Sequence, residues 1–263
     1  MLVDSHCHLN FPELSENIQS LRSNMTDAQV SHALCVSVTL DKFPEVLSLA
    51  ERFDNFYASV GVHPDYEDID EPTVDQLVTL AQHPKIVAIG ETGLDYYRLT
   101  GDLEWQRMRF RTHIRAAIKC SKPLIIHTRS AADDTLRIMR EEGAKQVGGV
   151  MHCFTESLDV ALAAIEMGFY ISFSGIVTFK NATQLKTVAQ AIPLSKMLVE
   201  TDSPYLAPMP FRGKTNQPAY VRYVAQEIAN LRGISLEAVM QATTENFFTL
   251  FKHAVAVDFR AAN

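Results

Sequence analysis

The sequence predicts an α/β fold, a single-domain (β/α)8 barrel. Two observations predict it. Short apolar runs recur along the 263 residues, each about one βα unit after the last. The segments between them repeat apolar residues every three to four positions, which is typical of amphipathic helices. The length is ordinary for one such barrel.

The apolar runs are expected to be strands, at 2–9, 32–38, 56–63, 86–94, 123–129, 148–154, 168–174 and 197–203. Helices are expected between them and after the last, at 73–82, 104–120, 131–142, 157–167, 181–191, 218–232 and 235–251. Ser235 is the candidate N-cap of the last helix. We expect one domain over 1–263, with the C-terminal helices at 218–251. The alternative is a doubly wound open sheet, whose usual GxGxxG after the first strand is missing here.

Composition excludes several classes of protein. With 24 Lys and Arg against 31 Asp and Glu, the net charge is −7, which argues against a protein that coats nucleic acid regardless of sequence. It does not exclude an enzyme that meets nucleic acid at a local site. The four cysteines are scattered, which favours reduced thiols in the cytoplasm. We expect neither a signal peptide nor a membrane span.

The pair His6 and His8 lies at the end of the first expected strand. Residues i and i+2 of a strand point to one face, so both imidazoles are expected at the C-terminal mouth of the barrel. Neutral imidazole is a ligand for Zn, Mn or Fe. Taken alone, the pair is also compatible with two polar residues at a strand end.

The same pattern recurs on other strands, where Glu91, His127, His152 and Asp202 each follow an apolar run. Burying an ionisable group without a partner costs several kcal/mol. Such groups at one end of one barrel must therefore satisfy one another, and a metal cluster does so directly.

Four histidines, one Glu and one Asp exceed the ligand set of one open catalytic zinc. Divided between two divalent ions, they leave positions for water and substrate. Glu91 is the candidate bridge, because its strand stands between the first strand and the fifth and sixth. A bridging carboxylate holds two ions about 3.5–4 Å apart, as in two-metal phosphoesterases. The donor set accepts Zn, Mn, Mg, Fe or Co.

Asp202 has a second expected role, as the base that takes a proton from the attacking water. Glu200 lies two residues earlier and shares its face. It is expected to orient the site, to hold a third metal, or to satisfy neighbouring polar groups, with the first of these favoured.

An anionic substrate needs cationic partners near the metals. Arg129 lies two residues after His127, and it is expected to contact a phosphate or to pair with a carboxylate such as Asp95. His63 and the loop residues Arg212 and Lys214 are further candidates for phosphate contacts, and solvated surface is the alternative for the loop charges.

Aromatic residues also follow the expected strand ends, where they either stack on bases or pack within loops. They are Tyr96, Tyr97, Phe154, Tyr205 and Phe211. Cys7 and Cys153 flank two of the candidate ligands, and by alternation we expect them to point away from the site.

Seven motifs together resemble those of the TatD family of metal-dependent deoxyribonucleases, and in particular its YcfH-like branch. They occur in the same order between Asp4 and Phe251. The motifs are DSHCHL (4–9), GVHP (61–64), GETGLDYY (90–97), HTR (127–129), HCF (152–154), ETDSPYLAP (200–208) and RGKTNQP (212–218).

The resemblance implies a (β/α)8 barrel of the amidohydrolase-like class with two divalent metal ions. By carry-over, His6, His8, Glu91 and Asp202 bind one ion, and Glu91, His127 and His152 bind the other. Family members are described as nucleases that remove nucleotides from DNA ends, so the expected substrate is DNA, as single strands or ends. No membrane and no obligate protein partner is indicated.

Two other functions are compatible with the same residues. A small-molecule amidohydrolase, lactonase or phosphoesterase uses the same barrel, because a fold does not fix a function. Many such enzymes have a modified lysine as the bridge on the fourth strand, where this chain offers Glu91. A non-catalytic scaffold that holds metal is the other, although a closed structural site does not need open coordination positions.

Overall fold

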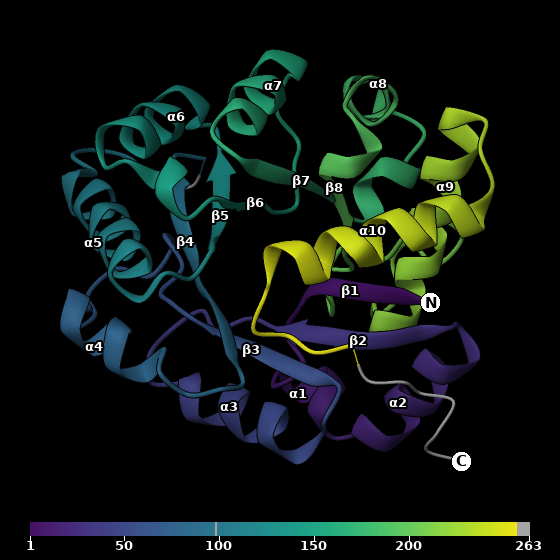
Figure 1. The fold of residues 1–263 in the computed structure, drawn as a ribbon, viewed down its shortest axis with the longest axis horizontal. Coiled ribbons are helices and arrows are strands. Elements are labelled where there is room, and N and C mark those ends of the chain that lie inside the picture. The colour runs from purple at the N-terminus through teal and green to yellow at the C-terminus, as the bar shows by residue number, and fades with distance from the viewer. Residues whose placement is uncertain (98, 257–263) are drawn as a thin grey trace.

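Over residues 1–97 and 99–256, which the computed structural model describes, eight parallel strands form one sheet in which each strand pairs with the next. A parallel bridge between Cys7 and Ser203 brings the first and last strands together. The sheet is therefore a nearly closed barrel, as predicted (Figure 1). The strands are β1 (Leu2–Cys7), β2 (Val30–Cys35), β3 (Phe56–Val60), β4 (Ile86–Asp95), β5 (Leu124–Arg129), β6 (Gly149–Met151), β7 (Phe169–Phe173) and β8 (Met197–Val199).

Helices surround the barrel, and side-chain caps define where several of them begin (Figure 1). At α4, the Thr73 side chain accepts from the Gln76 amide, and the Gln76 side chain accepts from the Thr73 amide. Ser235 caps α10 by accepting from the Ala238 amide, as predicted. The α-helices are α1 (Pro12–Ser15), α2 (Ile18–Asp27), α3 (Phe43–Arg52), α4 (Val74–Leu80), α5 (Glu104–Cys120), α6 (Ala132–Glu141), α7 (Leu158–Glu166), α8 (Thr183–Ala191), α9 (Val221–Arg232) and α10 (Leu236–Leu250). Short 3-10 turns are η1 (Ala144–Gln146), η2 (Gly175–Thr178), η3 (Leu194–Lys196) and η4 (Pro218–Tyr220).

The buried side chains form two groups. One fills the space between strands and helices, and the other fills the inside of the barrel. The inner group includes Leu34, Val87 and Ile125 together with Phe247 and Phe251, which come from α10 and the residue that caps it. Helix α10 thus closes one end of the barrel, the end that faces the viewer in Figure 1. The functional opening is left at the other end, where the strands finish.

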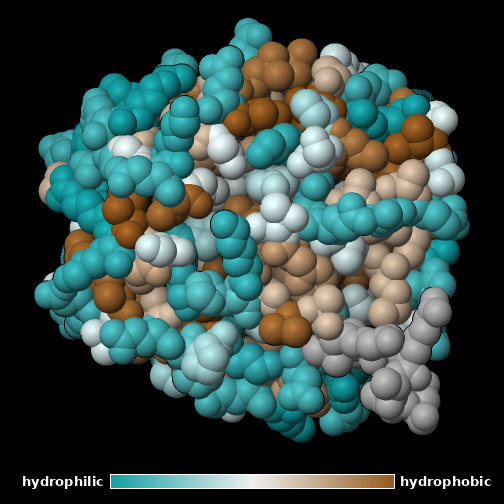
Figure 2. Space-filling view, viewed as in Figure 1, coloured by the Kyte–Doolittle hydropathy of each residue, from teal (hydrophilic) through white to brown (hydrophobic). Residues whose placement is uncertain are grey.

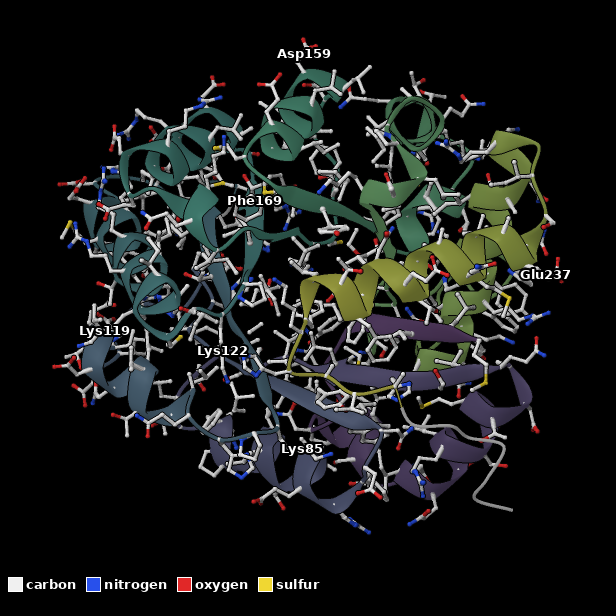
Figure 3. The ribbon with its side chains drawn as sticks, in the orientation of Figure 1. Lys85, Lys119, Lys122, Asp159, Phe169 and Glu237 are labelled. Atoms are coloured by element: carbon white, nitrogen blue, oxygen red, sulfur yellow. The ribbon has the colours of Figure 1, made fainter. Side chains whose placement is uncertain are left out.

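Most of the labelled charged side chains lie at the surface, and Lys122 is a buried exception. Figure 2 shows hydrophilic residues over most of the α10 face, with hydrophobic patches between them. In Figure 3, Lys119, Asp159 and Glu237 point outward at the periphery. Lys122, by contrast, is buried and donates to the Ala81 and Ile86 carbonyls, so this ammonium group joins separate segments.

The predicted strands all occur, but several end early. β1 ends at Cys7 and β6 at Met151, so His8 and His152 follow their strands rather than closing them. The His8 amide donates to the Ser203 carbonyl at 2.8 Å, which turns the chain toward the segment after β8. Helices α1 to α3 lie in stretches for which no helix was predicted.

The expected span of 1–263 includes residues 98 and 257–263, which lie outside the described residues. None of the described helices combines the length and apolar character needed to cross a membrane.

Candidate metal centre and active site

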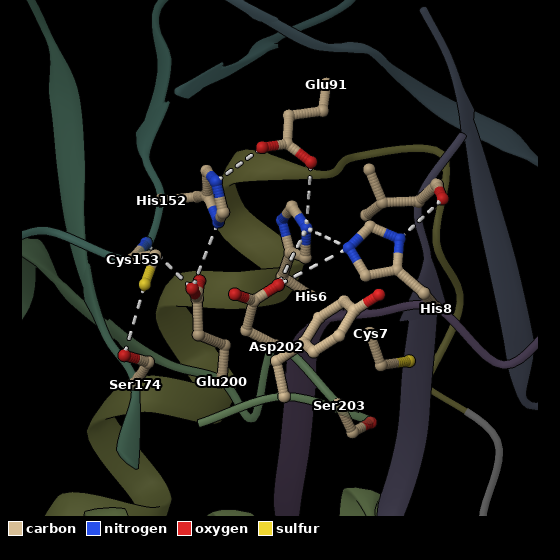
Figure 4. A network of polar contacts seen from close by, with 12 residues as sticks. His6, Cys7, His8, Glu91, His152, Cys153, Ser174, Glu200, Asp202 and Ser203 are labelled. Atoms are coloured by element: carbon tan, nitrogen blue, oxygen red, sulfur yellow. Dashed lines mark hydrogen bonds and ion pairs between the residues drawn. The ribbon is translucent and has the colours of Figure 1, made fainter. Parts of the chain in front are cut away.

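A cavity of about 840 Å³ opens at the C-terminal ends of the strands. Its lining brings together residues that are far apart in the sequence: His8, His63, Glu91, His127, His152 and Asp202. His6 lies behind them, fully buried at 0% exposure. Figure 4 shows five of them, His6, His8, Glu91, His152 and Asp202, converging from different parts of the barrel. The structure therefore gathers all six predicted metal ligands at one place.

Glu91 lies at the centre of this cluster. Its Oε1 lies 2.7 Å from His152 Nε2 and 3.1 Å from His127 Nδ1. Its Oε2 lies 3.3 Å from His6 Nε2. The two oxygens thus face two different sets of imidazoles, which is the arrangement a bridging carboxylate requires.

The backbone around Glu91 is held by the segments that follow β2 and β3. The Glu91 amide donates to the Ser37 carbonyl at 3.0 Å. Gly61 allows β3 and β4 to approach, because a Cβ at this position would lie 2.5 Å from the carbonyl carbon of Gly90. Gly61 of the GVHP motif and Gly90 of the GETGLDYY motif therefore allow the close backbone packing beside the Glu91 carboxylate.

Three imidazoles each form a hydrogen bond, through one ring nitrogen, to a group that is not among the six predicted ligands. The pairs are His8 Nδ1 with the Val36 carbonyl at 3.2 Å, His127 Nε2 with Asp95 at 3.0 Å, and His152 Nδ1 with Glu200 at 3.2 Å. These partners accept hydrogen bonds, so each neutral ring carries its proton on that nitrogen.

The opposite nitrogens, His8 Nε2, His127 Nδ1 and His152 Nε2, are then lone pairs that face carboxylates of the cluster. A lone pair that faces a carboxylate is repulsive unless a proton or a cation lies between them. This donor set therefore fits divalent cations.

His63 differs from these three residues. Its Nδ1 accepts from the Asp65 amide at 3.1 Å, so the neutral ring carries its proton on Nε2. That nitrogen lies 3.4 Å from Glu91 Oε1 and can donate to it. Although His63 lies within ligand distance of Glu91 and His127, its hydrogen bonding suits a donor to an anion better than a metal ligand.

The candidate ligand atoms form three overlapping groups, each within 4.8 Å. They are His6 with His152 and Asp202, His6 with His8 and Glu91, and His63 with Glu91 and His127. All six predicted ligands occur in these groups. Their division between two ions stays a prediction.

The carboxylates of the cluster are ionised at neutral pH. Burial alone would raise the pKa of Glu91, but without a metal ion the positive charge of the surrounding imidazoles, that of His152 first, outweighs burial and holds this pKa well below its usual value. Burial also opposes ionisation of Asp202, yet without a metal ion a second proton on the His8 ring lets Nε2 donate to this carboxylate, and that bond together with the nearby imidazoles lowers its pKa. Asp202 lines the cavity, so this ionised oxygen can accept a proton there.

Glu200 holds His152 from behind. Its Oε1 accepts from the Cys153 amide at 2.7 Å as well as from the imidazole (Figure 4). Glu200 is fully buried, and these contacts agree with the expected orienting role.

The segment that carries Asp202 is fixed by two buried side chains. Asp4 accepts from the Thr201 amide at 2.8 Å. The Asn216 side-chain amide donates to the carbonyls of Thr201 and Tyr205, at 2.9 and 2.6 Å. Asp202 lies between these anchor points with a φ of 56°, in the left-handed region.

The predicted cationic partners are divided. Arg129 lines the cavity, and its guanidinium lies 3.8 Å from the centroid of the Tyr97 ring. Arg212 and Lys214 are exposed in the loop after β8. Arg212 packs over the Phe179 ring. Neither Arg212 nor Lys214 is among the described residues that line the cavity. Phosphate contact by Arg129 and by His63 stays a prediction.

One prediction is wrong. Cys153 lines the cavity, with its Sγ 3.3 Å from Ser174 Oγ, whereas alternation predicted that it points away. β6 ends at Met151 and Cys153 has a φ of 42°, so the alternation of a strand no longer applies there. Cys7 is buried, and its Sγ donates to the Leu34 carbonyl.

Sequence reasoning missed two lining aromatic residues, Phe11 and Tyr66, and the part played by Asp95. Phe11 and Tyr66 come from loops after β1 and β3, where no strand pattern indicates direction. The only signal for Tyr66 was its place three residues after His63.

The fold and the site define a class of protein, a (β/α)8 barrel whose C-terminal cavity offers imidazoles and carboxylates to divalent cations. The chain belongs to the TatD family: residues 3–252 match the family described as TatD related DNase.

Relatives and solved structures agree with this membership. The chain is 46% identical over 253 residues to a protein of Escherichia coli K12 named uncharacterized metal-dependent hydrolase YcfH, covering 95% of each. It is 41% identical to the similarly named YabD of Bacillus subtilis, covering 96% of this chain and 99% of that one. The crystal structure of YjjV, a TatD homologue from E. coli K12, superimposes with a TM-score of 0.88 at 29% identity, covering 95% and 98%. Membership, the relatives' names and the donor groups give the coarse class, a metal-dependent hydrolase of the TatD family.

Proposed function

We propose that this chain hydrolyses phosphodiester bonds of DNA, as an exonuclease acting on single strands or ends with two divalent metal ions. The observation that carries the proposal is that three imidazoles turn a nitrogen toward Glu91 or Asp202 in the cavity, where a proton or a cation must lie between the two groups. The description of the family as a DNase supports the choice of DNA.

The charges of the lining residues support two ions and an anionic substrate. The described lining contains four carboxylates, those of Asp65, Glu91, Asp95 and Asp202. Among the described lining residues, Arg129 is the only Arg or Lys. Without cations such a cavity repels phosphate. Two divalent ions balance the four carboxylates, and Arg129 then leaves the site attractive to an anion.

In this proposal, His6, His8, Glu91 and Asp202 hold one ion, and Glu91, His127 and His152 hold the other. When bound, such ions supply Lewis-acid polarisation of the phosphoryl group and acidify water at neutral pH.

The chain's own groups supply the remaining steps. The Asp202 carboxylate accepts the proton of the attacking water, for which its lowered pKa keeps it ionised. Arg129 and the Nε2–H of His63 donate to phosphate oxygens. Glu200 and Asp95 hold His152 and His127 in the required tautomers.

The test is hydrolysis of end-labelled single-stranded DNA by metal-stripped protein, with Mg²⁺, Mn²⁺ or Zn²⁺ added back. We expect stepwise shortening that metal restores. The His127→Ala variant should lose more than about a hundredfold in rate, since even partners of ligands contribute about 10–100-fold. His83→Ala, which removes an imidazole paired with Glu51 on the surface, is the matched control and should keep full activity.

The two other functions are separate outcomes of the same assay. Turnover of lactones, amides or small phosphodiesters without DNA cleavage would indicate a small-molecule hydrolase on the same barrel. Loss of stability on chelation, with no turnover of any substrate, would indicate a metal-holding scaffold. Either result contradicts the proposal.

A further inference from the structure

An exposed tyrosine ring stands at the mouth of the cavity on a fixed backbone. The Tyr205 side chain is 54% exposed and lines the cavity. Its amide donates to the Asp202 carbonyl at 3.0 Å, and its carbonyl accepts from Asn216 at 2.6 Å. The turn that positions the Asp202 carboxylate therefore also positions this ring. Tyrosine is enriched at binding surfaces, because its ring is apolar and its hydroxyl can stay in water.

Two further aromatic residues line the same mouth. Phe11 stacks on the His8 imidazole, with ring centroids 5.0 Å apart and planes 18° apart. Its ring meets Tyr205 edge to face at 6.2 Å. Tyr66 is 38% exposed and stands edge-on to His63. Burial, followed by the Tyr205 phenol and the Glu91 carboxylate, raises the pKa of Tyr66, as expected when the two phenols lie near each other. We call Phe11, Tyr66 and Tyr205 the aromatic rim.

The other aromatic candidates are less suited to a ligand: three are buried or in contact with other groups, and Tyr97, although 62% exposed, is not among the described lining residues. Phe154 is buried. Phe211 stacks on Tyr220, with ring centroids 4.1 Å apart. The Tyr96 hydroxyl donates to Asp134. Tyr97 has its ring against the Arg129 guanidinium. The aromatic rim therefore offers the rings that a bound molecule can reach beside the candidate metal-binding residues.

The two sides of the cavity differ in chemistry. Arg129 ends β5 and suits phosphate, whereas Phe11 and Tyr205 follow the adjoining strands β1 and β8 across the barrel and offer an apolar, flat surface there. A nucleotide has these same two parts, an anionic phosphate and a flat base.

We propose that Tyr205, backed by Phe11, is the stacking platform for the base of the nucleotide being removed, an inference that rests on the proposed function. Every base has an aromatic face, so such a platform recognises a nucleobase without selecting its sequence. It also disfavours a base that is still paired, because pairing buries that face in the duplex.

The test compares binding of two probes to the Mn²⁺-loaded protein by calorimetry. One is dAMP, and the other is deoxyribose 5-phosphate, which lacks the base. We expect the wild type to bind dAMP more tightly than the baseless probe. Tyr205→Ala should weaken dAMP binding about tenfold, within the range of one lost stacking contact. Its binding of deoxyribose 5-phosphate should change by less than about twofold.

Two variants serve as controls. Tyr205→Phe keeps the ring and should retain the preference for dAMP. Tyr223→Ala removes a comparably exposed tyrosine, 39% exposed on α9, and should have no effect on either probe.

The inference is overturned if the wild type binds both probes equally, or if Tyr205→Ala weakens both by the same factor. The result is independent of DNA cleavage. A base preference that depends on Tyr205 in a protein that does not cleave DNA would contradict the proposed function and leave the base platform standing.

Discussion

Single residues outside the cluster decide which imidazole nitrogens face into it. The sequence indicates that His8, His127 and His152 gather at one end of the barrel, but it cannot indicate their tautomers. Those follow from the Val36 carbonyl and the Asp95 carboxylate, and from Glu200. Such partners come from distant parts of the chain, so neither spacing nor alternation predicts them.

Asp95→Asn tests this reasoning at one residue. Asp95 accepts from the Tyr97 amide at 2.9 Å and from His127 Nε2. An asparagine that keeps its oxygen on Tyr97 turns its NH2 toward His127, which favours the proton on Nδ1 and removes the lone pair from the cluster. We expect Mn²⁺ affinity to fall about 10–100-fold by calorimetry.

Asp102→Asn is the matched control, since Asp102 is 83% exposed and pairs with Arg107 at the surface. It should bind Mn²⁺ like the wild type. Equal affinity in both variants would show that Asp95 does not set the state of His127.

At the level of elements, the segment after β8 shows what sequence patterns leave out. The RGKTNQP motif suggested cations for phosphate, and Arg212 and Lys214 proved to be exposed outside the cavity lining. The residue of this motif with contacts at the site is Asn216, which is fully buried. Its partners are backbone carbonyls, and no pattern of side-chain types reveals which carbonyls a loop brings together.

Asn216→Ala tests the role of this segment. The substitution leaves the carbonyls of Thr201 and Tyr205 without their donor in a buried place. We expect the free energy of unfolding to fall by about 1–3 kcal/mol in urea denaturation.

Asn230→Ala on α9 removes an exposed amide that pairs with Gln226, and it should change stability by less than about 0.5 kcal/mol. If the two variants proved equally stable, Asn216 would not be what holds the segment.

For the whole molecule, the sequence predicted the barrel well, because the regular spacing of the apolar runs and the order of the strands decide this fold. Eight apolar runs separated by helical segments leave few topologies, and the order of pairing follows from right-handed crossovers. The ends of strands were less predictable. β6 and β8 have three residues each. The residues that follow them, His152 and Glu200, form backbone hydrogen bonds to Ile126 and Phe173 at the mouth of the barrel.

Acid should destabilise the folded protein through His113. In α5 this buried imidazole accepts from the Val62 amide at Nε2 and donates to the Arg109 carbonyl at Nδ1. Burial lowers its pKa from 6.5 to about 4. Between these values the unfolded chain binds a proton that the folded chain does not, so the free energy of unfolding falls as the pH falls. This group contributes a loss of about 3 kcal/mol between pH 6.5 and 4.

Urea denaturation at pH 7 and pH 4.5 measures this effect. His113→Gln, which is less stable at pH 7, should show a smaller loss on acidification than the wild type. His83→Gln, at a partly exposed imidazole, should keep the wild-type loss. Equal losses in the wild type and His113→Gln would assign the acid sensitivity to other groups.

The most direct measurement of the central claim is a titration of Mn²⁺ into metal-stripped protein, with hydrolysis of end-labelled single-stranded DNA followed at each step. Glu91 faces imidazoles with both of its oxygens, so the site should need two ions per chain to work. We expect little hydrolysis up to one equivalent, a steep rise toward two, and no rise in Glu91→Gln. Full activity at one equivalent would contradict the two-metal centre, and no hydrolysis at any equivalent would contradict cleavage of DNA.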